Sequence, residues 1–363
     1  MPVKSVAVVS AYRSGTGSTS VALSYQEALV ANGRTTRWYQ CVSAGPDSAY
    51  ILGDRPLRGI GLGMGRASIL LNALSAFPLM VRRLPEDVLF LTDPILLGAA
   101  EKRRESVVVV HDIRELTTHR WNPLTQMGFR YLFHRLSEAS LIIADSETTR
   151  EDLRSGYPID IPVEVVHPPS RLRGDAVRHI PRSVETVQGA GRVNVLYVAA
   201  DRRYKNVGFF IDLADRIFRS AASARFRFTL VSDLSPPHRA RVRALALPNL
   251  TVRSYVDEIT TTYEDADVLL FPSAMEGFGL PLVEAMQFGI PLLAHDASTI
   301  PEVTGDAAML LPDLDLGRWT GALLGLLDGS TYERLATRSR ERGEAFTPES
   351  FAARVAPVID RYF

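Results

Sequence analysis

The sequence predicts an α/β protein made of two domains, each built around a parallel β-sheet. A chain of 363 residues is too long for one ordinary hydrophobic core and suits two domains of about 150 residues each. Short runs rich in valine, isoleucine and leucine alternate with longer segments of helical periodicity, and this pattern occurs twice. Hydrophobic residues make up 46% and charged residues 23% of the chain, which excludes intrinsic disorder, collagen-like repeats and coiled coils.

Each series of short apolar runs predicts strands that are buried on both faces of a sheet. The runs of the first series are Val6–Val9, Val107–Val110, Leu141–Ala144 and Val163–Val166. Those of the second series are Asn194–Val198, Phe228–Val231, Val268–Phe271, Pro291–Ala294 and Ala308–Leu311. Strands that alternate with helices form parallel sheets, so we expect ligands at the loops that follow the carboxyl ends of the strands.

The domain boundaries follow from a stretch between the two series. Residues 168–192 are rich in proline and glycine and lack apolar periodicity, which predicts a linker. We expect an N-terminal domain over residues 1–170, a linker over 171–192, a second domain over 193–345 and a C-terminal helix over 346–363. That helix carries an apolar stripe that must pack against another part of the chain. The stripe consists of Phe351, Val355, Val358, Ile359 and Tyr362.

Charge and cysteine content limit the location and the partners. The 41 basic residues balance 41 acidic residues, so we expect no nucleic-acid partner. The single cysteine, Cys41, forms no internal disulfide, and Val6–Val9 is much shorter than the apolar core of a signal peptide. The longest apolar run, Ala67–Val81, contains Asn72 and Pro78 and falls short of the ~20 residues of a membrane-spanning helix. A cytoplasmic location is therefore expected.

The most informative stretch is Phe271–Gly289, whose pattern predicts a strand, a loop and a helix. Proline is favoured at the first helical position, so the helix should start near Pro281 and end before Gly289. Gly279 and Leu280 precede the proline, and no Ser, Thr, Asp or Asn side chain is available to cap the first backbone amides. A helix start of this kind, flanked by glycine, is a typical binding site for phosphate.

Two carboxylates accompany this helix start. Glu276 lies in the loop before the helix and Glu284 lies about one turn inside it. Carboxylates accept hydrogen bonds from neighbouring sugar hydroxyls, so the pair can hold two parts of one ligand. A purely structural interpretation stays open for Glu284, because an acidic residue near the start of a helix interacts favourably with the helix dipole.

The stretch Glu276-Gly-Phe-Gly-Leu-Pro-Leu-Val-Glu284 resembles the motif of family 4 retaining glycosyltransferases, also described as glycosyl transferases group 1. The resemblance extends to Pro272-Ser273 and to Ile300–Ala308, covering roughly residues 193–312, and is looser in the first half of the chain. It implies the GT-B fold, in which two Rossmann-like domains with parallel sheets face a central cleft. It also implies that the C-terminal helix packs back on the N-terminal domain.

The resemblance implies roles for the donor-site residues. Glu284 would hold the ribose hydroxyls of a nucleotide-diphosphate sugar, Glu276 would meet the donor sugar, and Gly279 and Leu280 would offer amides to the phosphates. The remaining donor contacts are expected at Ser273, Gly277 and Phe278, with the nucleobase at Tyr255 and Val256.

Family members also carry a lysine after the first strand of the second domain, and Lys205 lies there. It is the only lysine beyond residue 102, in a chain whose other basic residues there are all arginine, which indicates a need for a compact point charge. An arginine usually assists this lysine. Arg202 and Arg203 are both candidates for the diphosphate contact, and the choice between them stays open.

The N-terminal domain adds two features of the same resemblance. His111 follows the run Val107–Val110, where family members often carry a histidine, and we expect it to position and polarise the reacting groups. Gly15, Thr16 and Gly17 resemble the glycine-rich first loop of the family and are expected near the acceptor. The loop lacks the Lys-Ser/Thr pair of a phosphate-binding P-loop.

The implied activity is retaining, metal-independent transfer of a hexose to a hydroxyl of a saccharide or lipid-linked saccharide, in bacterial polysaccharide or glycolipid biosynthesis. No cofactor is expected. The pairs Asp265/Asp267 and Asp313/Asp315 match the Asp-x-Asp pattern of metal-using transferases, but the first precedes its strand and the second opens a helix. Two alternatives stay open: a non-catalytic nucleotide-sugar binding or scaffold protein, and a GT-B sugar-nucleotide epimerase.

Membrane contact is a further open point. Arg58–Arg66 alternates glycine with apolar residues and precedes an apolar segment flanked by arginines, and the first half of the chain has a small excess of basic residues. These features fit either a peripheral surface for the inner face of a membrane or a loop that leads into a core helix. The donor base, the donor sugar, the acceptor and the oligomeric state are not fixed by the sequence.

Overall fold

A computed structural model describes residues 4–10, 17–40, 42–43, 49–52, 55–58, 73–74, 76–100, 104–113, 123–172, 191–254 and 259–362. The chain forms two compact units. Unit 1 consists of Met1–Pro169 with Pro348–Phe363, and unit 2 consists of Ser170–Thr347. Residues 173–190 of the expected linker lie outside the described residues, while Arg171 and Leu172 pack in unit 2.

Unit 1 is built on a six-stranded parallel sheet with the order β2-β1-β6-β7-β8-β9. The strands are β1 (Val6–Ser10), β2 (Thr36–Gln40), β6 (Val88–Leu91), β7 (Ser106–Val110), β8 (Leu141–Ala144) and β9 (Val163–Val165). The four expected strands are confirmed, and β2 and β6 are additions. A small antiparallel sheet joins β3 (Val42–Ser43), β4 (Ala49–Leu52) and β5 (Arg55–Arg58).

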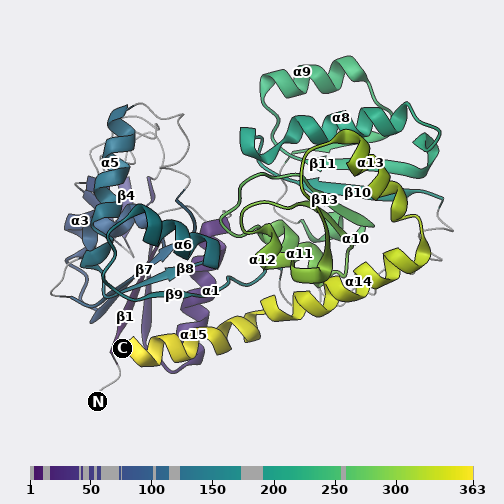
Figure 1. The fold of residues 1–363 in the computed structure, drawn as a ribbon. Coiled ribbons are helices and arrows are strands. Elements are labelled where there is room, and N and C mark those ends of the chain that lie inside the picture. Colours follow the sequence, from purple (N-terminus) through teal and green to yellow (C-terminus); the bar gives the residue numbers. More distant parts are fainter. Residues whose placement is uncertain are drawn as a thin grey trace. The chain divides into compact units, whose positions relative to one another are not determined.

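Helices flank this sheet, and one of them comes from the far end of the chain (Figure 1). They include α1 (Gly17–Ala31), α3 (Ala76–Val81), α5 (Pro123–His134), α6 (Glu147–Gly156), the 3₁₀ helix η1 (Pro94–Ala99) and α15 (Pro348–Tyr362). The buried Phe351 of α15 meets Tyr25 of α1 edge to face, with ring centroids 4.9 Å apart. The C-terminal helix therefore packs on the N-terminal unit, as expected.

Unit 2 contains a second six-stranded parallel sheet with the order β12-β11-β10-β13-β14-β15. Its strands are β10 (Val193–Val198), β11 (Phe226–Val231), β12 (Leu250–Arg253), β13 (Val268–Phe271), β14 (Leu292–His295) and β15 (Ala308–Leu311). The strand order reverses between β10 and β13, which lie side by side in the middle. The loops after these two strands therefore diverge to opposite faces of the sheet, and ligands bind preferentially at such a point.

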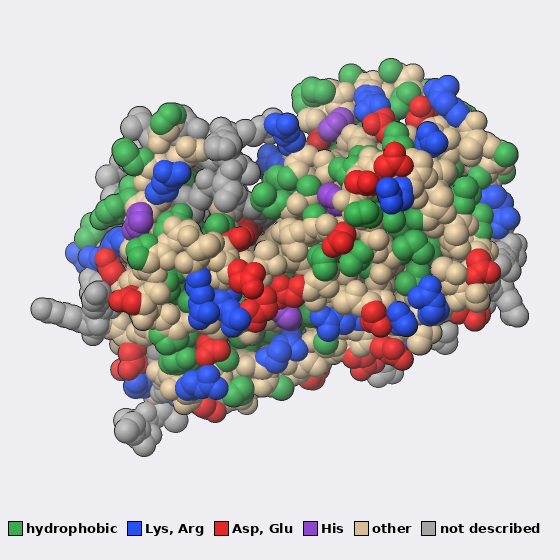
Figure 2. Space-filling view, in the orientation of Figure 1, with side chains coloured by type: hydrophobic (Ala, Val, Ile, Leu, Met, Phe, Trp, Pro, Cys, Tyr) green, Lys and Arg blue, Asp and Glu red, His purple; other side chains and the backbone are tan. Residues whose placement is uncertain are grey.

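The helices of unit 2 cover both faces of this sheet (Figure 1). They are α8 (Val207–Phe218), α9 (Pro236–Leu245), α10 (Thr260–Glu264), α11 (Leu280–Gln287), α12 (Ile300–Thr304), α13 (Leu316–Gly325) and α14 (Gly329–Gly343). Helix α14 approaches α11 closely at Gly343, where an added Cβ would lie 2.8 Å from the carbonyl of Met286. Basic and acidic side chains are interspersed on the face shown in Figure 2.

Candidate functional site

Helix α11 begins at the point that the sequence predicts, and no side chain caps it. Its N-cap residue, Gly279, has φ +97°, a left-handed conformation that L side chains rarely adopt. An added Cβ would also lie 3.0 Å from Leu282 Cδ1. Among the described residues, none accepts a hydrogen bond from the backbone amides of Gly279 or Leu280. These amides and the helix dipole create a positive potential at the start of α11.

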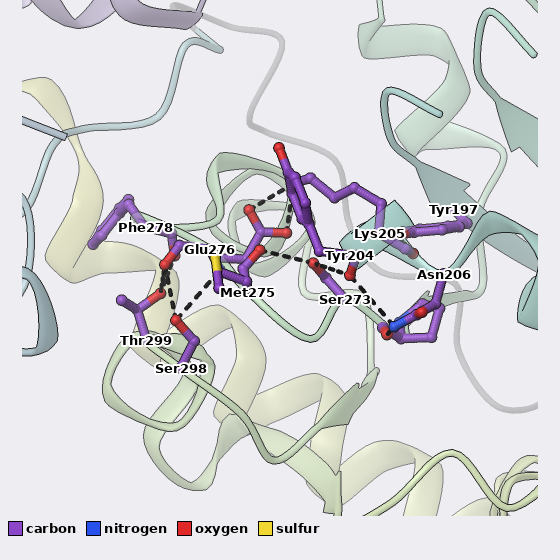
Figure 3. A network of polar contacts seen from close by, with 11 residues as sticks. Tyr197, Tyr204, Lys205, Asn206, Ser273, Met275, Glu276, Phe278, Ser298 and Thr299 are labelled. Carbon is purple, nitrogen blue, oxygen red and sulfur yellow. Dashed lines mark hydrogen bonds and ion pairs between the residues drawn. The ribbon is translucent and has the colours of Figure 1, made fainter. Parts of the chain in front are cut away.

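Lys205 is brought to this helix start by the loop after β10. The loop contains a 3₁₀ turn, η4 (Arg203–Lys205), and the buried Tyr197 hydroxyl of β10 donates a hydrogen bond to the Lys205 carbonyl. The lysine Nζ lies 2.5 and 2.6 Å from the two carboxylate oxygens of Glu276. The side chains are 14% and 5% exposed, so the two charges form a nearly buried ion pair. Figure 3 shows the two side chains pointing toward each other.

Asn206 fastens the lysine loop to the loop after β13. It adopts a left-handed conformation, with φ +53°, and its side-chain amide donates to the Pro272 carbonyl at 2.8 Å. A second bridge runs from the Ala274 amide to the Tyr204 carbonyl, also at 2.8 Å. The buried Ser273 hydroxyl donates within its own loop to the Met275 carbonyl at 3.1 Å. The two loops at the reversal of strand order are thus connected by backbone-directed bonds (Figure 3).

A third loop, after β14, fixes the backbone of Glu276. The Ser298 hydroxyl donates to the Glu276 carbonyl at 3.0 Å and accepts from the Glu276 amide at 3.3 Å. Ser298 has φ +54°, a strained conformation for a non-glycine residue. The Thr299 hydroxyl lies within hydrogen-bond distance of the carbonyls of Glu276 and Phe278, at 3.4 and 3.3 Å. The loop that carries Glu276 is therefore held in one conformation from two sides (Figure 3).

Glu284 lies deeper, with a side chain that is 0% exposed. Both of its carboxylate oxygens are engaged: Arg171 Nε lies 2.5 Å from Oε1, and the Tyr263 hydroxyl donates to Oε2 at 2.6 Å. Tyr263 is itself buried and stacks on Phe288, with ring centroids 5.8 Å apart and an interplanar angle of 13°. The helix dipole alone therefore does not account for Glu284, because two side chains from outside α11 converge on it.

The arginine candidates and their neighbours complete the lysine loop. Arg202 and Arg203 are both exposed, and the structure does not distinguish between them. Asp201 accepts from the Ser235 amide at 2.7 Å and from His238 Nδ1 at 2.9 Å. Burial raises the pKa of Asp201, but these hydrogen bonds outweigh it and lower the pKa below its ordinary value. An ionised Asp201 thus links the loop to the start of α9.

His111 follows β7 in unit 1, at the carboxyl end of the strand as the sequence predicts. Its Nδ1 lies 2.7 Å from Asp145 Oδ2 and its Nε2 lies 3.1 Å from the Thr92 carbonyl. Burial lowers the pKa of His111, but the carboxylates of Asp145, Asp93 and Asp112 more than compensate and raise it to about 9. Because both ring nitrogens face acceptors, the doubly protonated imidazolium satisfies this geometry, and His111 is a hydrogen-bond donor at neutral pH.

The structure brings together Lys205, Glu276, Ser273, Gly277, Phe278, Gly279 and Leu280, with Glu284 beneath them, in unit 2. Gly15, Thr16, Tyr255 and Val256 lie outside the described residues, as do residues 59–72, and Gly17 is the first residue of α1. Sequence reasoning missed five residues of the site: Arg171, Tyr197, Asn206, Tyr263 and Ser298. Of these five, only Asn206 left a signal, as a polar residue directly after the lysine.

The two Asp-x-Asp pairs serve the backbone. Asp267 is buried and accepts from the Asn194 amide at 2.7 Å, and Asp315 caps α13 by accepting from the Arg318 amide at 2.7 Å. In the described part of the chain, no group of three or more His, Cys, Asp or Glu side chains has the arrangement of a metal site. Likewise, none of the described helices is both long and apolar enough to cross a bilayer.

Two family models match the chain. The model described as Glycosyltransferase Family 4 matches residues 15–170, and the model described as Glycosyl transferases group 1 matches residues 192–329. The O-antigen chain mannosyltransferase B of Escherichia coli is 24% identical over 64% of this chain and 64% of its own length. The MMP alpha-(1->4)-mannosyltransferase of Mycolicibacterium hassiacum is 36% identical over 50% of this chain and 47% of its own. The matches thus span less than two thirds of either relative.

Solved structures share the fold over the whole chain. A sucrose-phosphate synthase from Thermosynechococcus elongatus superimposes with a TM-score of 0.77 at 17% identity, covering 99% of this chain and 98% of that one. WaaG, a glycosyltransferase involved in lipopolysaccharide biosynthesis, gives a TM-score of 0.71 at 16% identity, covering 98% and 99%. The expected GT-B fold is confirmed by these neighbours and by the two parallel sheets. The two family models, one for each half of the chain, show that this chain belongs to glycosyltransferase family 4.

Proposed function

We propose that the chain is a retaining glycosyltransferase that moves a sugar from a nucleotide diphosphate to a hydroxyl of a saccharide or lipid-linked saccharide. The observation that carries this proposal is the Lys205–Glu276 pair beside the uncapped start of α11. A diphosphate placed there receives two amides, a helix dipole and a lysine, and Glu276 is then free to accept hydrogen bonds from the donor sugar. The family membership supports the same reaction class.

The reaction is a substitution at the anomeric carbon of the donor sugar. The bond between this carbon and the diphosphate oxygen breaks, and the acceptor oxygen forms a new bond on the same face of the sugar. The acceptor proton passes to the departing phosphate. Negative charge that develops on the diphosphate is stabilised by Lys205, by one of Arg202 and Arg203, and by the amides of α11. Glu276 positions the sugar in this scheme and forms no covalent bond.

Two further residues have supporting roles in the proposal. Glu284 binds the ribose hydroxyls of the donor. Both ring nitrogens of His111 face Asp145 and the Thr92 carbonyl, so in the proposal His111 acts through its positive charge, which fits positioning and polarisation of the reacting groups. Its pKa, raised to about 9, argues against a role as general base. The site residues supply the positive charge at the phosphates, so we also propose that the reaction needs no metal ion.

The direct test is a transfer assay with a panel of nucleotide sugars, in which the anomeric configuration of the product is read by NMR. We expect the product to keep the configuration of the donor, Glu276→Ala to lose at least about a hundredfold in kcat, and activity to persist in EDTA. An inverted product would exclude the retaining mechanism. Loss of activity in EDTA, restored by manganese, would contradict metal independence. Binding of nucleotide sugar without any turnover would favour the scaffold alternative.

Bacterial polysaccharide or lipopolysaccharide assembly is the proposed setting. The O-antigen mannosyltransferase and WaaG are named for such pathways, and a neighbouring structure, HepE of Anabaena, is described in complex with UDP and glucose (TM-score 0.66, 15% identity, 99% of each chain). These names support a nucleotide-sugar donor and a saccharide acceptor. We propose that UDP, GDP, dTDP and ADP be compared as donor nucleotides.

Peripheral membrane contact belongs to the same proposal. Unit 1 exposes Leu79 of α3 (60%) and Met127 and Tyr131 of α5 (63% and 57%), and Arg83 and Arg130 are exposed beside them in the sequence. Apolar and basic side chains together favour an anionic lipid surface. Flotation with anionic vesicles at low salt should recover the protein with the lipid, and a protein that stays at the bottom of the gradient would exclude this part of the proposal.

A further inference from the structure

Glu284 presents a conflict between its geometry and its proposed role. A ribose that binds this carboxylate must reach it, yet the side chain is 0% exposed and both oxygens already accept hydrogen bonds. At least one neighbour must therefore move when a nucleotide binds. The neighbours that donate to the carboxylate are Arg171 and Tyr263, and they differ sharply in their freedom to move.

Tyr263 is the fixed partner. It is 1% exposed, and its ring stacks on Phe288 at an interplanar angle of 13° within the core of unit 2. Displacing a ring packed in this way would open a cavity in the core, which is strongly destabilising. Its hydroxyl therefore holds Glu284 Oε2 in place whether or not Oε1 changes its partner.

Arg171 is the partner that can leave. Its side chain is 18% exposed, and it reaches Glu284 through Nε at the end of a long chain of rotatable bonds. The backbone around it is anchored: the Ser170 amide donates to the Phe346 carbonyl at 3.0 Å, the Leu172 amide donates to Ser170 Oγ at 3.0 Å, and Leu172 lies in the core. The side chain of Arg171 is therefore the part of this contact that can move while its backbone stays in place.

We propose that Arg171 and the ribose of the donor nucleotide compete for Glu284, so that nucleotide binding exchanges the Arg171 contact for ribose hydroxyls while Tyr263 keeps the carboxylate in register. The inference rests on the proposed function, because it assumes a nucleotide in unit 2. It makes Arg171 a residue that weakens nucleotide binding. The opposite role, in which Arg171 stays and orients Glu284, predicts the opposite effect of removing it.

The test compares wild type with Arg171→Met by calorimetric titration of UDP, GDP, dTDP and ADP into the intact protein. Methionine keeps an unbranched apolar chain and removes the charged donor. A hydrogen bond to a charged group corresponds to roughly a tenfold change in affinity, so we expect the best nucleotide to bind Arg171→Met about tenfold more tightly. Removing a positive charge would by itself weaken binding of a diphosphate, so a gain is a stringent result. The matched control is Arg219→Met, an exposed arginine that pairs with Asp215 on α8.

The gain in nucleotide affinity must also depend on the ribose hydroxyls. We expect the 2′,3′-dideoxy form of the same nucleotide to bind wild type and Arg171→Met equally, because it has no hydroxyl to offer Glu284. Unchanged or weaker binding of the ribonucleotide to Arg171→Met, or an equal gain for the dideoxy form, overturns the exchange. If no nucleotide binds either wild type or Arg171→Met, the proposed function and the exchange are both overturned. Binding to Arg171→Met alone supports both.

A measurement on the wild-type protein covers the case in which Arg171→Met does not fold. Phenylglyoxal modifies accessible arginines, and mass spectrometry locates the modified residue. Saturating nucleotide should increase the modification of Arg171, because its side chain is released from Glu284. Unchanged or decreased modification of Arg171, with nucleotide binding verified in the same sample, would overturn the exchange.

Discussion

The Lys205–Glu276 ion pair should serve ligand binding and contribute little net stability to the folded protein. A double-mutant cycle tests the contribution to stability directly. The pair is nearly buried, with side chains 14% and 5% exposed, and the lysine contacts both carboxylate oxygens. Removal of one partner leaves a buried charge without compensation, which costs about 3 to 5 kcal/mol. Lys205→Met should fall in this range, because the Glu276 carboxylate that remains is the more buried of the two.

The double variant Lys205→Met, Glu276→Gln contains no charge at either position. Replacement of a buried ion pair by neutral groups of similar size is often close to neutral for stability. We therefore expect the double variant to recover most of the loss, with a coupling free energy of at least about 2 kcal/mol between the two positions. Nucleotide binding should be lost in Lys205→Met and in the double variant, because the lysine contact to the diphosphate is gone. The single variant Glu276→Gln should still bind the nucleotide, because Glu276 meets the sugar and not the diphosphate.

Thermal unfolding of the intact protein measures the stability effect. For a unit of this size, about 3 kcal/mol lowers the melting temperature by roughly 6 to 12 °C, which is readily resolved. The reasoning is refuted if the destabilisation of the double variant equals the sum of the two single-variant destabilisations within about 0.5 kcal/mol. Two side chains in direct buried contact cannot be independent.

Three further predictions follow from other parts of the structure. Gly343→Ala should destabilise the protein by at least about 1 kcal/mol in thermal unfolding, because the new Cβ would lie 2.8 Å from the Met286 carbonyl of α11. Gly321→Ala is the control and should be neutral or stabilising, because nothing lies within 4 Å of its new Cβ. Equal effects of the two substitutions would contradict the contact. The pKa of His111 is raised from 6.5 to about 9, so its stabilising contribution is fully present below about pH 6.5 and is lost as the pH rises through about 9. The melting temperature of wild type should therefore fall more between pH 6 and 9 than that of His111→Gln. Parallel curves of melting temperature against pH would count against the His111–Asp145 geometry. Asn206→Ala should be about 1 kcal/mol less stable than Asn206→Gly, because residue 206 has φ +53°. Both variants should lose nucleotide affinity, because both lose the bridge to Pro272. Calorimetry checks the affinity, and an unaltered affinity would remove Asn206 from the site.

The sequence predicted those parts of the fold where burial on both faces leaves an uninterrupted apolar run. Strands such as β8 and β13 consist of four apolar residues each and were expected at the correct place. β2 was missed because an edge strand, Thr36–Gln40, contains polar residues and lacks such a run. β6, Val88–Leu91, is as short and as apolar as β8 and β13, so the sequence carried its signal and the prediction overlooked it.

The sequence predicted those parts of the candidate site that depend on neighbouring residues in the chain. The start of α11, the two glutamates and the lone lysine are recognisable because glycine, proline and the choice of lysine over arginine have local causes. The partners of these residues are not local: Arg171 lies 113 residues from Glu284 in the chain, and Lys205 lies 71 residues from Glu276. Neither contact has a periodicity or a spacing that a single sequence displays, so both depend on the order of strands in the sheet.

Nucleotide-dependent thermal stabilisation of wild type and of Glu284→Gln tests the central claim, which is a nucleotide-diphosphate site on unit 2, most directly. A ligand at about 100 times its dissociation constant stabilises a protein by about 2.7 kcal/mol. Among UDP, GDP, dTDP and ADP, one nucleotide should raise the melting temperature of wild type and of Arg219→Met, and the increase should be lost in Glu284→Gln. If no nucleotide stabilises wild type, or if Glu284→Gln responds as wild type does, the site described here does not bind a nucleotide in this way.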